Sequence, residues 1–195
     1  MSLRNNFAWM LAGRGVYAVC QWLVIVVIAQ IGAPEKLGEY TFALAVISPV
    51  VVFSQLNLRA FMVTDIKYKF EYEDYYAARI TTSAISFIVS VFVLFLNDYS
   101  YSLSILIITI SIYKLVELIS DLYYGVLQKQ GDMSYVSLSL MFHGMALLIS
   151  MVVFVYLLDS VLYGAAVVIL AWLFILLKYD MPAASKEMGK FFLCD

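Results

Sequence analysis

Six long apolar runs divide the chain, and short polar segments separate them. A helix needs about 20 residues to cross a bilayer core of about 30 Å, so each run is long enough to span a membrane. The pattern predicts an all-α polytopic membrane protein, with a bundle of six transmembrane helices in residues 1–180 and a cytoplasmic tail in 181–195. The predicted spans are roughly 7–31, 40–63, 75–96, 102–125, 134–158 and 161–179.

Five of these runs contain polar residues at spacings of three, four and seven, which places them on one face of a helix. A charge at the bilayer centre costs about 2.5–3.5 kcal/mol on insertion scales, so such faces normally point into a bundle or a watery cavity. We therefore expect the faces to meet and line a polar cleft. From the first run to the fifth they contain Arg14 and Gln21; Gln55 and Arg59; Arg79; Lys114, Glu117 and Asp121; and His143.

Composition supports the membrane assignment. The chain is 64% hydrophobic and 13% charged, whereas soluble domains average roughly 45–50% and 25%. The net charge of −2 gives no basic surface for nucleic acid, so we expect no nucleic-acid partner. Two cysteines, Cys20 and Cys194, and the single His143 do not have the spacing of a disulfide framework or metal site. We expect no metal and no cofactor.

Basic residues are distributed unevenly between the two sets of connecting segments. Short basic loops resist translocation and stay in the cytoplasm. The N-terminus, the second and fourth loops and the tail hold seven basic residues, and the opposite loops hold only Lys36. Both termini are therefore predicted to be cytoplasmic. The seven are Arg4, Lys67, Lys69, Lys129, Lys178, Lys186 and Lys190.

The predicted cleft has a surplus of positive charge. Four cations, Arg14, Arg59, Arg79 and Lys114, face two acids, Glu117 and Asp121, which leaves two positive charges. Guanidinium groups bind phosphate well, so the surplus predicts an anionic ligand such as a pyrophosphate or a lipid head group. The acids would form a coupling or charge network, and Gln21, Gln55 and His143 would add polar groups to the cavity.

Structural explanations of these residues stay open beside the functional one. Arg59 and Arg79 lie near the second loop and could snorkel to the interface. Lys114 and Glu117 could be only an intrahelical pair, and His143 only a packed histidine. Pro49 predicts either a kink or a break in the second span.

The sequence contains no catalytic motif. No serine lies in a Gly-x-Ser-x-Gly pattern, no His-Glu-x-x-His helix is present, and Asp121 is the only aspartate within a predicted span. We expect that the protein is not an enzyme.

Two stretches resemble a known family. The run "QWLVIVVIAQIGAPEKLGEYTFALAVISPVVVFSQLNLRAFMVTD" (21–65) and the segment "ISDLYYGVLQKQGDM" (119–133) are similar to the amino-terminal half of bacterial polysaccharide biosynthesis proteins. These are lipid-linked oligosaccharide flippases of the multidrug/oligosaccharidyl-lipid/polysaccharide exporter superfamily. Characteristic patterns are Gly-x-x-x-x-x-Gly-x-Tyr at Gly32 to Tyr40 and Asp-x-x-Tyr-Gly-x-x-Gln at Asp121 to Gln128.

The resemblance implies one lobe of a two-lobed transporter in the bacterial inner membrane. Such flippases move undecaprenyl-pyrophosphate-linked sugar units from the cytoplasmic to the periplasmic leaflet in O-antigen, capsule or exopolysaccharide synthesis. By helix position, Arg14, Arg59 and Arg79 correspond to the family's pyrophosphate-binding cations. Implied partners are the lipid-linked oligosaccharide, membrane lipids, polysaccharide assembly proteins, and a second lobe or homodimer partner. A complete member has about twice this length, which implies a fragment, a truncated or frameshifted product, or a half-size protein.

Two other functions remain open. One is a multidrug or cation antiporter lobe, in which Glu117 and Asp121 bind a cationic substrate. The other is a membrane assembly subunit that binds partner proteins and transports nothing. An antiporter lobe would prefer cationic ligands, whereas a flippase would prefer anionic ones. An assembly subunit would move no lipid, which separates it from a flippase.

Overall fold

The computed structural model describes residues 3–65 and 70–191. Lys67, Lys69 and Cys194 lie outside these residues, and the side chain of Lys190 is not among those described. The elements are α1 (Leu3–Ile31), α2 (Pro34–Gln55), α3 (Leu58–Thr64), α4 (Tyr72–Phe95), α5 (Tyr101–Lys129), α6 (Met133–Leu158), α7 (Val161–Ile175), a π-helical turn η1 (Leu176–Asp180) and α8 (Met181–Phe191).

The prediction of an all-α membrane protein is confirmed. The described residues form helices and no strand, and six helical segments are long and apolar enough to cross a membrane. The segments are Arg4–Ile31, Pro34–Thr64, Tyr72–Phe95, Tyr101–Lys129, Met133–Leu158 and Val161–Lys186.

Proline and polar residues at the ends of the apolar runs account for several helix starts. Pro34 occupies the first turn of α2, where its missing N–H costs nothing. The side chains of Ser100 and Ser160 accept backbone N–H groups at the starts of α5 and α7. Glu71 and Asp74 form a reciprocal capping box at the start of α4.

The second span is where the observed helix differs most from the expected one. It starts at Pro34, earlier than the predicted residue 40, and α2 continues through Pro49 without interruption. The chain breaks at Leu56 and Asn57, and α3 then completes the span. The sequence between the two helices contains no glycine or proline, so the usual signal for a break is missing.

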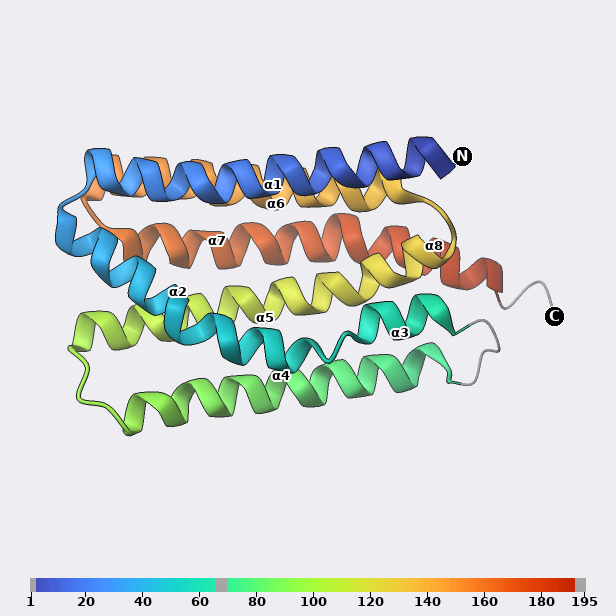
Figure 1. Ribbon diagram of the computed structural model, residues 1–195, viewed down its shortest axis with the longest axis horizontal. Coiled ribbons are helices and arrows are strands. Elements are labelled where there is room, and N and C mark those ends of the chain that lie inside the picture. The colour runs from blue at the N-terminus through green and yellow to red at the C-terminus, as the bar shows by residue number, and fades with distance from the viewer. Residues whose placement is uncertain (1–2, 66–69, 192–195) are drawn as a thin grey trace.

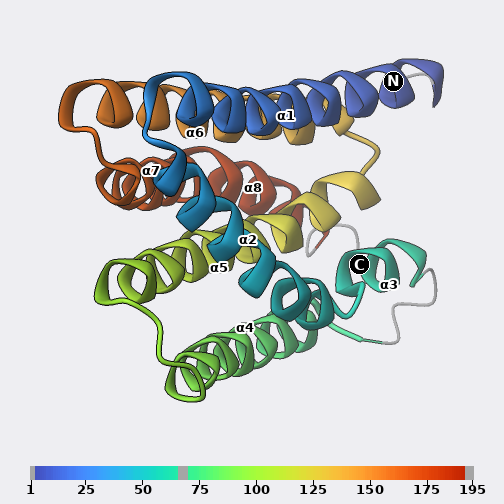
Figure 2. The same cartoon turned by 60° about the vertical axis from the view of Figure 1, so that its left-hand side comes forward.

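Helix α5 is at the centre of the bundle. It packs against α2, α3, α4, α6, α7 and α8, whereas α1 packs mainly against α6 and less against α2. Figure 1 shows α1 beside α6 along one side of the bundle and α4 on the other, with α5 and α7 between them. Figure 2 shows α2 crossing obliquely from the α1 side toward α4. Residues 181–191 of the predicted tail are helical, as α8, and contact α5.

The core combines aromatic and aliphatic side chains from several helices. Trp172 of α7 is fully buried, and its ring centroid lies 5.2 Å from that of Tyr113 on α5 and 5.0 Å from that of His143 on α6. Large apolar side chains such as Phe53, Phe95 and Leu170 are exposed on the outside of the bundle. In a bilayer these outer faces contact lipid tails, so their exposure is expected.

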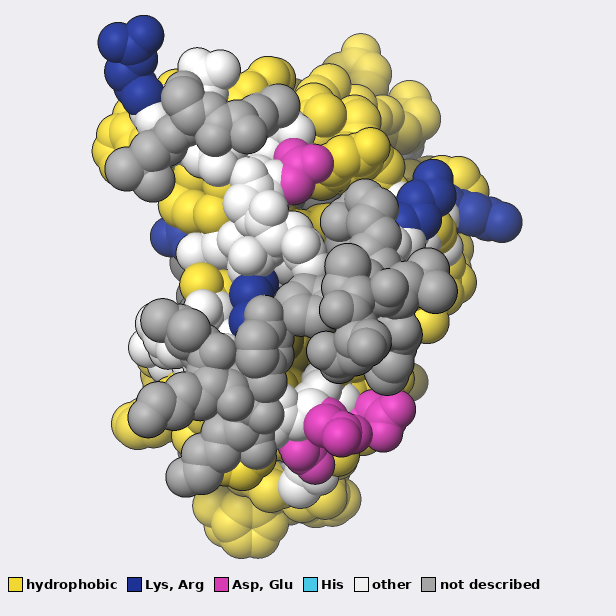
Figure 3. All heavy atoms as spheres, turned by 90° about the vertical axis from the view of Figure 1, so that its right-hand side faces the viewer, with side chains coloured by type: hydrophobic (Ala, Val, Ile, Leu, Met, Phe, Trp, Pro, Cys, Tyr) yellow, Lys and Arg dark blue, Asp and Glu magenta, His cyan; other side chains and the backbone are white. Residues whose placement is uncertain are grey.

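The two ends of the bundle differ in charge. Helix α1 begins and α8 ends at the same end, which also holds the α5–α6 connection (Figure 1). Figure 3 looks onto this end, where charged and other polar side chains lie among hydrophobic ones. Its described basic residues are Arg4, Lys129, Lys178 and Lys186, whereas Lys36 lies at the opposite end in an ion pair with Asp159.

Candidate functional site

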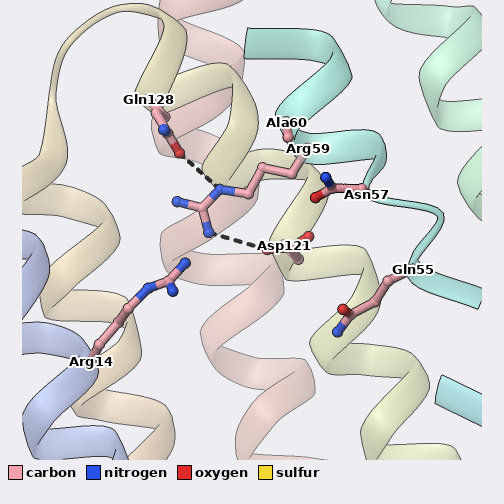
Figure 4. A pocket seen from close by; sticks show the side chains of 7 residues that line it. All are labelled: Arg14, Gln55, Asn57, Arg59, Ala60, Asp121 and Gln128. Atoms are coloured by element: carbon pink, nitrogen blue, oxygen red, sulfur yellow. Dashed lines mark hydrogen bonds and ion pairs between the residues drawn. The ribbon is translucent and has the colours of Figure 1, made fainter. Parts of the chain in front are cut away.

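A polar pocket of about 390 Å³ lies between α1 and the α2–α3 break, against α5. Figure 4 shows Arg14 on one side of it, with Arg59, Asp121 and Gln128 opposite. Figure 1 shows α3, which contributes Arg59 and Ala60 to the pocket, in the half of the bundle near the end where α1 begins. It is lined by Arg14, Gln55, Asn57, Arg59, Ala60, Asp121 and Gln128.

The break between α2 and α3 forms one wall of this pocket. Leu56 and Asn57 both have left-handed backbone conformations, with φ of 43° and 51°. Asparagine tolerates this conformation, but leucine rarely adopts it, so the surrounding structure must hold Leu56 there. The freed carbonyl of Gln55 accepts a hydrogen bond from Arg79 Nη1 at 3.3 Å. The break thus supplies two amide side chains, Gln55 and Asn57, and a backbone acceptor.

Asp121 joins two arginines from different helices. Its Oδ1 lies 3.1 Å from Arg59 Nη1, and its Oδ2 lies 3.4 Å from Arg79 Nη2. Arg79 is fully buried behind the carboxylate and does not line the pocket, while Asp121 is partly exposed to it. Gly125, one turn after Asp121, lies where α3 packs on α5, because a Cβ there would meet the end of the Met62 side chain and lie 3.7 Å from Arg59 Cα. The charged groups of α3, α4 and α5 therefore meet at one carboxylate.

Arg59 is held on several sides but keeps one free group. Its Nε donates to Gln128 Oε1 at 2.9 Å, and its guanidinium lies 5.6 Å from the ring centroid of Tyr124. The Nη2 group is buried and has no hydrogen-bond partner among the described residues. Because a buried unpaired donor is unfavourable, Nη2 is ready to bind an acceptor in the pocket.

Arg14 lies across the pocket from Arg59 and is unpaired. Its side chain points from α1 toward the guanidinium of Arg59 (Figure 4). Within the described part of the chain it makes no hydrogen bond or ion pair. With Arg59, Arg79 and Asp121, the pocket and its wall contain three cations and one anion, a surplus of two positive charges.

Lys114 and Glu117 form a separate network earlier in α5, before Asp121. Lys114 Nζ lies 2.7 Å from Glu117 Oε2, and the hydroxyl of Tyr17 on α1 donates to Glu117 Oε1 at 2.6 Å. Neither residue lines the pocket. Lys114 therefore lies outside the pocket that Arg14 and Arg59 line, and its charge is paired with Glu117.

Gln21 and His143, two residues expected in the cavity, do not line the pocket either. Gln21 is half-buried on α1, two turns beyond Arg14. His143 is buried on α6, where its Nδ1 contacts the Ser139 carbonyl at 2.9 Å. The backbone carbonyl of His143 accepts a hydrogen bond from Trp172 Nε1. His143 thus packs among protein neighbours outside this pocket, and the polar-cavity role of both residues stays a prediction.

Two polar lining residues were not proposed from the sequence. Gln128 lies on the same predicted face as Asp121, so the periodicity already contained this signal. Asn57 lines the pocket because the chain breaks there, which the sequence pattern did not indicate. In residues 3–65 and 70–191, no three His, Cys, Asp or Glu side chains gather in a way that could hold a metal ion.

Comparisons with known proteins add one relative. No protein-family model and no solved structure matches the chain. It is 31% identical over 137 residues to the capsular polysaccharide biosynthesis protein CapF of Staphylococcus aureus. The match covers 70% of this chain and 33% of CapF, so the chain spans about a third of the length of this relative. Fold and similarity together identify a six-span helical membrane protein related to a bacterial polysaccharide biosynthesis protein.

Proposed function

We propose that the chain forms one lobe of a flippase that moves undecaprenyl-pyrophosphate-linked sugar units across the bacterial inner membrane. Transport runs from the cytoplasmic to the periplasmic leaflet in polysaccharide biosynthesis. The observation that carries this proposal is the unpaired guanidinium of Arg14 facing Arg59 across a polar pocket. The similarity to a capsular polysaccharide biosynthesis protein supports the same pathway class.

The chemistry of the pocket suits a pyrophosphate. Guanidinium groups bind phosphate oxygens through paired N–H donors, and two arginines on opposite walls can contact both phosphates of one ligand. The amides of Gln55, Asn57 and Gln128 add neutral donors. The apolar outer faces of the helices leave the polyprenyl chain in the lipid while the charged head group enters the pocket.

Asp121 acts as an internal competitor for the ligand. In the empty pocket it pairs with Arg59 and Arg79, so the cations are partly neutralised without substrate. A pyrophosphate that takes over Arg59 Nη1 and the free Nη2 releases Oδ1 of Asp121. Binding exchanges one ion pair for another and breaks no covalent bond, so the protein acts as a transporter and not as an enzyme.

The second half of the transporter comes from another lobe. Transport by alternating access uses two lobes that rock around a shared site. A second copy of this chain, or the remainder of a longer protein, provides the partner lobe. With both termini in the cytoplasm, the pocket lies in the cytoplasmic half of the membrane, where the ligand enters.

The acidic residues count against the alternative of cation antiport. Asp121 already has two arginine partners and Glu117 has Lys114, so neither is free to bind a cationic drug. A competition assay between pyrophosphate and an organic cation separates the two functions, because a cation transporter binds the cation in preference to pyrophosphate.

Replacing Arg14 by Ala tests the proposal. Using the full chain in nanodiscs, we expect pyrophosphate and a polyprenyl-pyrophosphate sugar to bind about tenfold to a hundredfold more weakly. This corresponds to the loss of a charge-assisted hydrogen bond of about 1.5–3 kcal/mol. Calorimetric titration gives the Kd, and Arg14→Lys should retain part of the affinity.

The matched control is Arg4→Ala, since Arg4 is an exposed arginine on the same helix and does not line the pocket. Equal affinities for the Arg14→Ala variant and the unchanged chain, with both folded, contradict the proposed site. Binding without lipid movement in vesicles that contain the partner lobe would instead favour an assembly subunit.

A further inference from the structure

Asp180 is a fully buried carboxyl group outside the pocket. It ends the π-helical turn η1, and its side chain has no exposed surface. The described ion pairs are Lys36–Asp159, Arg59–Asp121, Arg79–Asp121 and Lys114–Glu117, and none of them includes Asp180. A buried carboxylate without a cation is strongly unfavourable, and in a membrane-spanning segment it is costlier still.

Neutral hydroxyl groups surround this carboxyl. Ser139 on α6 donates to Oδ1 at 2.5 Å, and Ser139 Oγ lies 2.7 Å from the hydroxyl of Tyr124 on α5. Oδ2 has no hydrogen-bond partner among the described residues. The buried hydroxyl of Ser120 on α5 lies beside Asp180 and likewise has no hydrogen-bond partner among the described residues.

The titratable groups that face Asp180 supply no positive charge. Helix α5 contributes Tyr123 and Tyr124, η1 itself Tyr179, and α6 contributes His143. The Nδ1 of His143 contacts a carbonyl, which requires it to donate, and its buried Nε2 has no partner. A second proton on Nε2 would be a buried charge without an acceptor, so the imidazole is neutral. The described basic residue of α8, Lys186, is exposed and does not pair with Asp180.

We infer that Asp180 is a proton-binding site in which the proton sits on Oδ2. The carboxylate takes up one proton to become a neutral carboxylic acid, which removes the unpaired charge. The new O–H can then donate to Ser120, so that one proton satisfies two otherwise unpartnered atoms. Oδ1 continues to accept from Ser139.

The surrounding hydrogen bonds also connect this site toward the pocket. From Oδ1 they run through Ser139 to the hydroxyl of Tyr124, and the face of the Tyr124 ring lies against the guanidinium of Arg59. The proton site and the arginine pocket therefore share one tyrosine. The proton site does not depend on which anion the pocket binds, so this inference can be tested separately from the proposed transport function.

Infrared spectroscopy of the full chain in nanodiscs tests the inference directly. With aspartate carboxyl groups labelled with ¹³C, we expect a C=O stretching band of a protonated carboxylic acid at mildly acidic pH that shifts with the label. Asp180→Asn should remove this band, and Asp121→Asn, which alters an ion-paired carboxylate, should leave it. Absence of the band in the unchanged chain, or its persistence in Asp180→Asn, overturns the inference.

A second variant covers the case in which Asp180→Asn does not fold. Ser139→Ala removes the donor to Oδ1 without touching the carboxyl, so the band should move to higher frequency as its carbonyl loses a hydrogen bond. A band at the same position in Ser139→Ala shows that the protonated group is not Asp180, and overturns the inference.

Discussion

At the scale of single residues, the carboxylate of Asp121 organises the site. It is the one described acid that contacts arginines from two other helices, α3 and α4. Removal of one partner from a partly buried ion pair leaves the other charge without compensation, which typically costs about 3–5 kcal/mol. The structure of the pocket therefore depends on a residue that the proposed pyrophosphate ligand would displace.

Asp121→Asn is expected to change stability and binding in opposite directions. Without ligand, the variant should unfold at a lower temperature, because Arg59 and Arg79 lose their counter-charge. Pyrophosphate should bind more tightly, since its competitor has gone, and should raise the melting temperature more than in the unchanged chain. Thermal unfolding at several pyrophosphate concentrations measures both effects.

Asp98→Asn is the control for this experiment, because Asp98 is exposed in the α4–α5 connection at the other end of the bundle. Asp98→Asn should change neither the melting temperature nor the affinity for pyrophosphate. Weaker pyrophosphate binding in Asp121→Asn would mean that the carboxylate positions the arginines for the ligand and does not compete with it.

Periodicity predicted part of this site and missed part of it. Arg59, Asp121 and Gln128 could be placed on inward faces because a membrane-spanning helix turns its polar residues away from lipid. Periodicity gives a direction around each helix but no distance between helices, so it could not separate Lys114 from the pocket. It also could not show that His143 faces Trp172 instead.

At the scale of elements, close contact between α1 and α6 positions Arg14. The backbone of Gly13 lies directly against Ser137, since a Cβ on Gly13 would be 2.6 Å from Ser137 Cα. A Cβ on Gly144 of α6 would make a less severe contact, 3.1 Å from Tyr17 Cα. Small residues at such contacts allow helices in membranes to approach closely. Because Arg14 follows Gly13 directly, this contact determines how far the arginine extends into the pocket.

Gly13→Ala and Gly15→Ala form a matched pair of substitutions on α1. A Cβ at Gly13 requires the backbones to separate, so we expect destabilisation of about 1–3 kcal/mol. A Cβ at Gly15 meets no atom within 4 Å, and alanine favours the helix by about 0.5–1 kcal/mol, so this variant should be as stable or more stable. Thermal unfolding in detergent compares them. Equal losses of stability in the two variants would show that α1 does not pack on α6 through Gly13.

The break in the second span could not be predicted from local sequence. Leucine and asparagine at positions 56 and 57 give no turn signal comparable to glycine or proline. The break instead reflects tertiary contacts, including the hydrogen bond between Arg79 and the carbonyl of Gln55. Pro49, which did suggest a local change, is accommodated within α2.

At the scale of the whole molecule, the six spans and their order were the most predictable feature. Each span needs about 20 apolar residues, and this requirement leaves a signal that no tertiary contact can remove. An even number of spans puts the start of α1 and the end of α8 at one end (Figure 1). The basic residues then predict which side of the membrane that end faces.

Cysteine labelling tests this orientation. In a chain whose two native cysteines are changed to serine, Asp98→Cys should react with a membrane-impermeant maleimide in intact spheroplasts. Gln130→Cys should react only after the membrane is permeabilised. Both positions are exposed, in connections at opposite ends of the bundle. The reverse pattern would place the termini in the periplasm.

The hydrogen bond between Tyr17 and Glu117 has a consequence for ligand selectivity. Helix α1 packs mainly on α6, and this bond ties it directly to α5 one turn from Arg14. Its length therefore helps to fix the distance between the two walls of the pocket. In the proposed binding mode, an anion too short to reach from Arg14 to Arg59 would contact only one wall, and a longer diphosphate would bridge both.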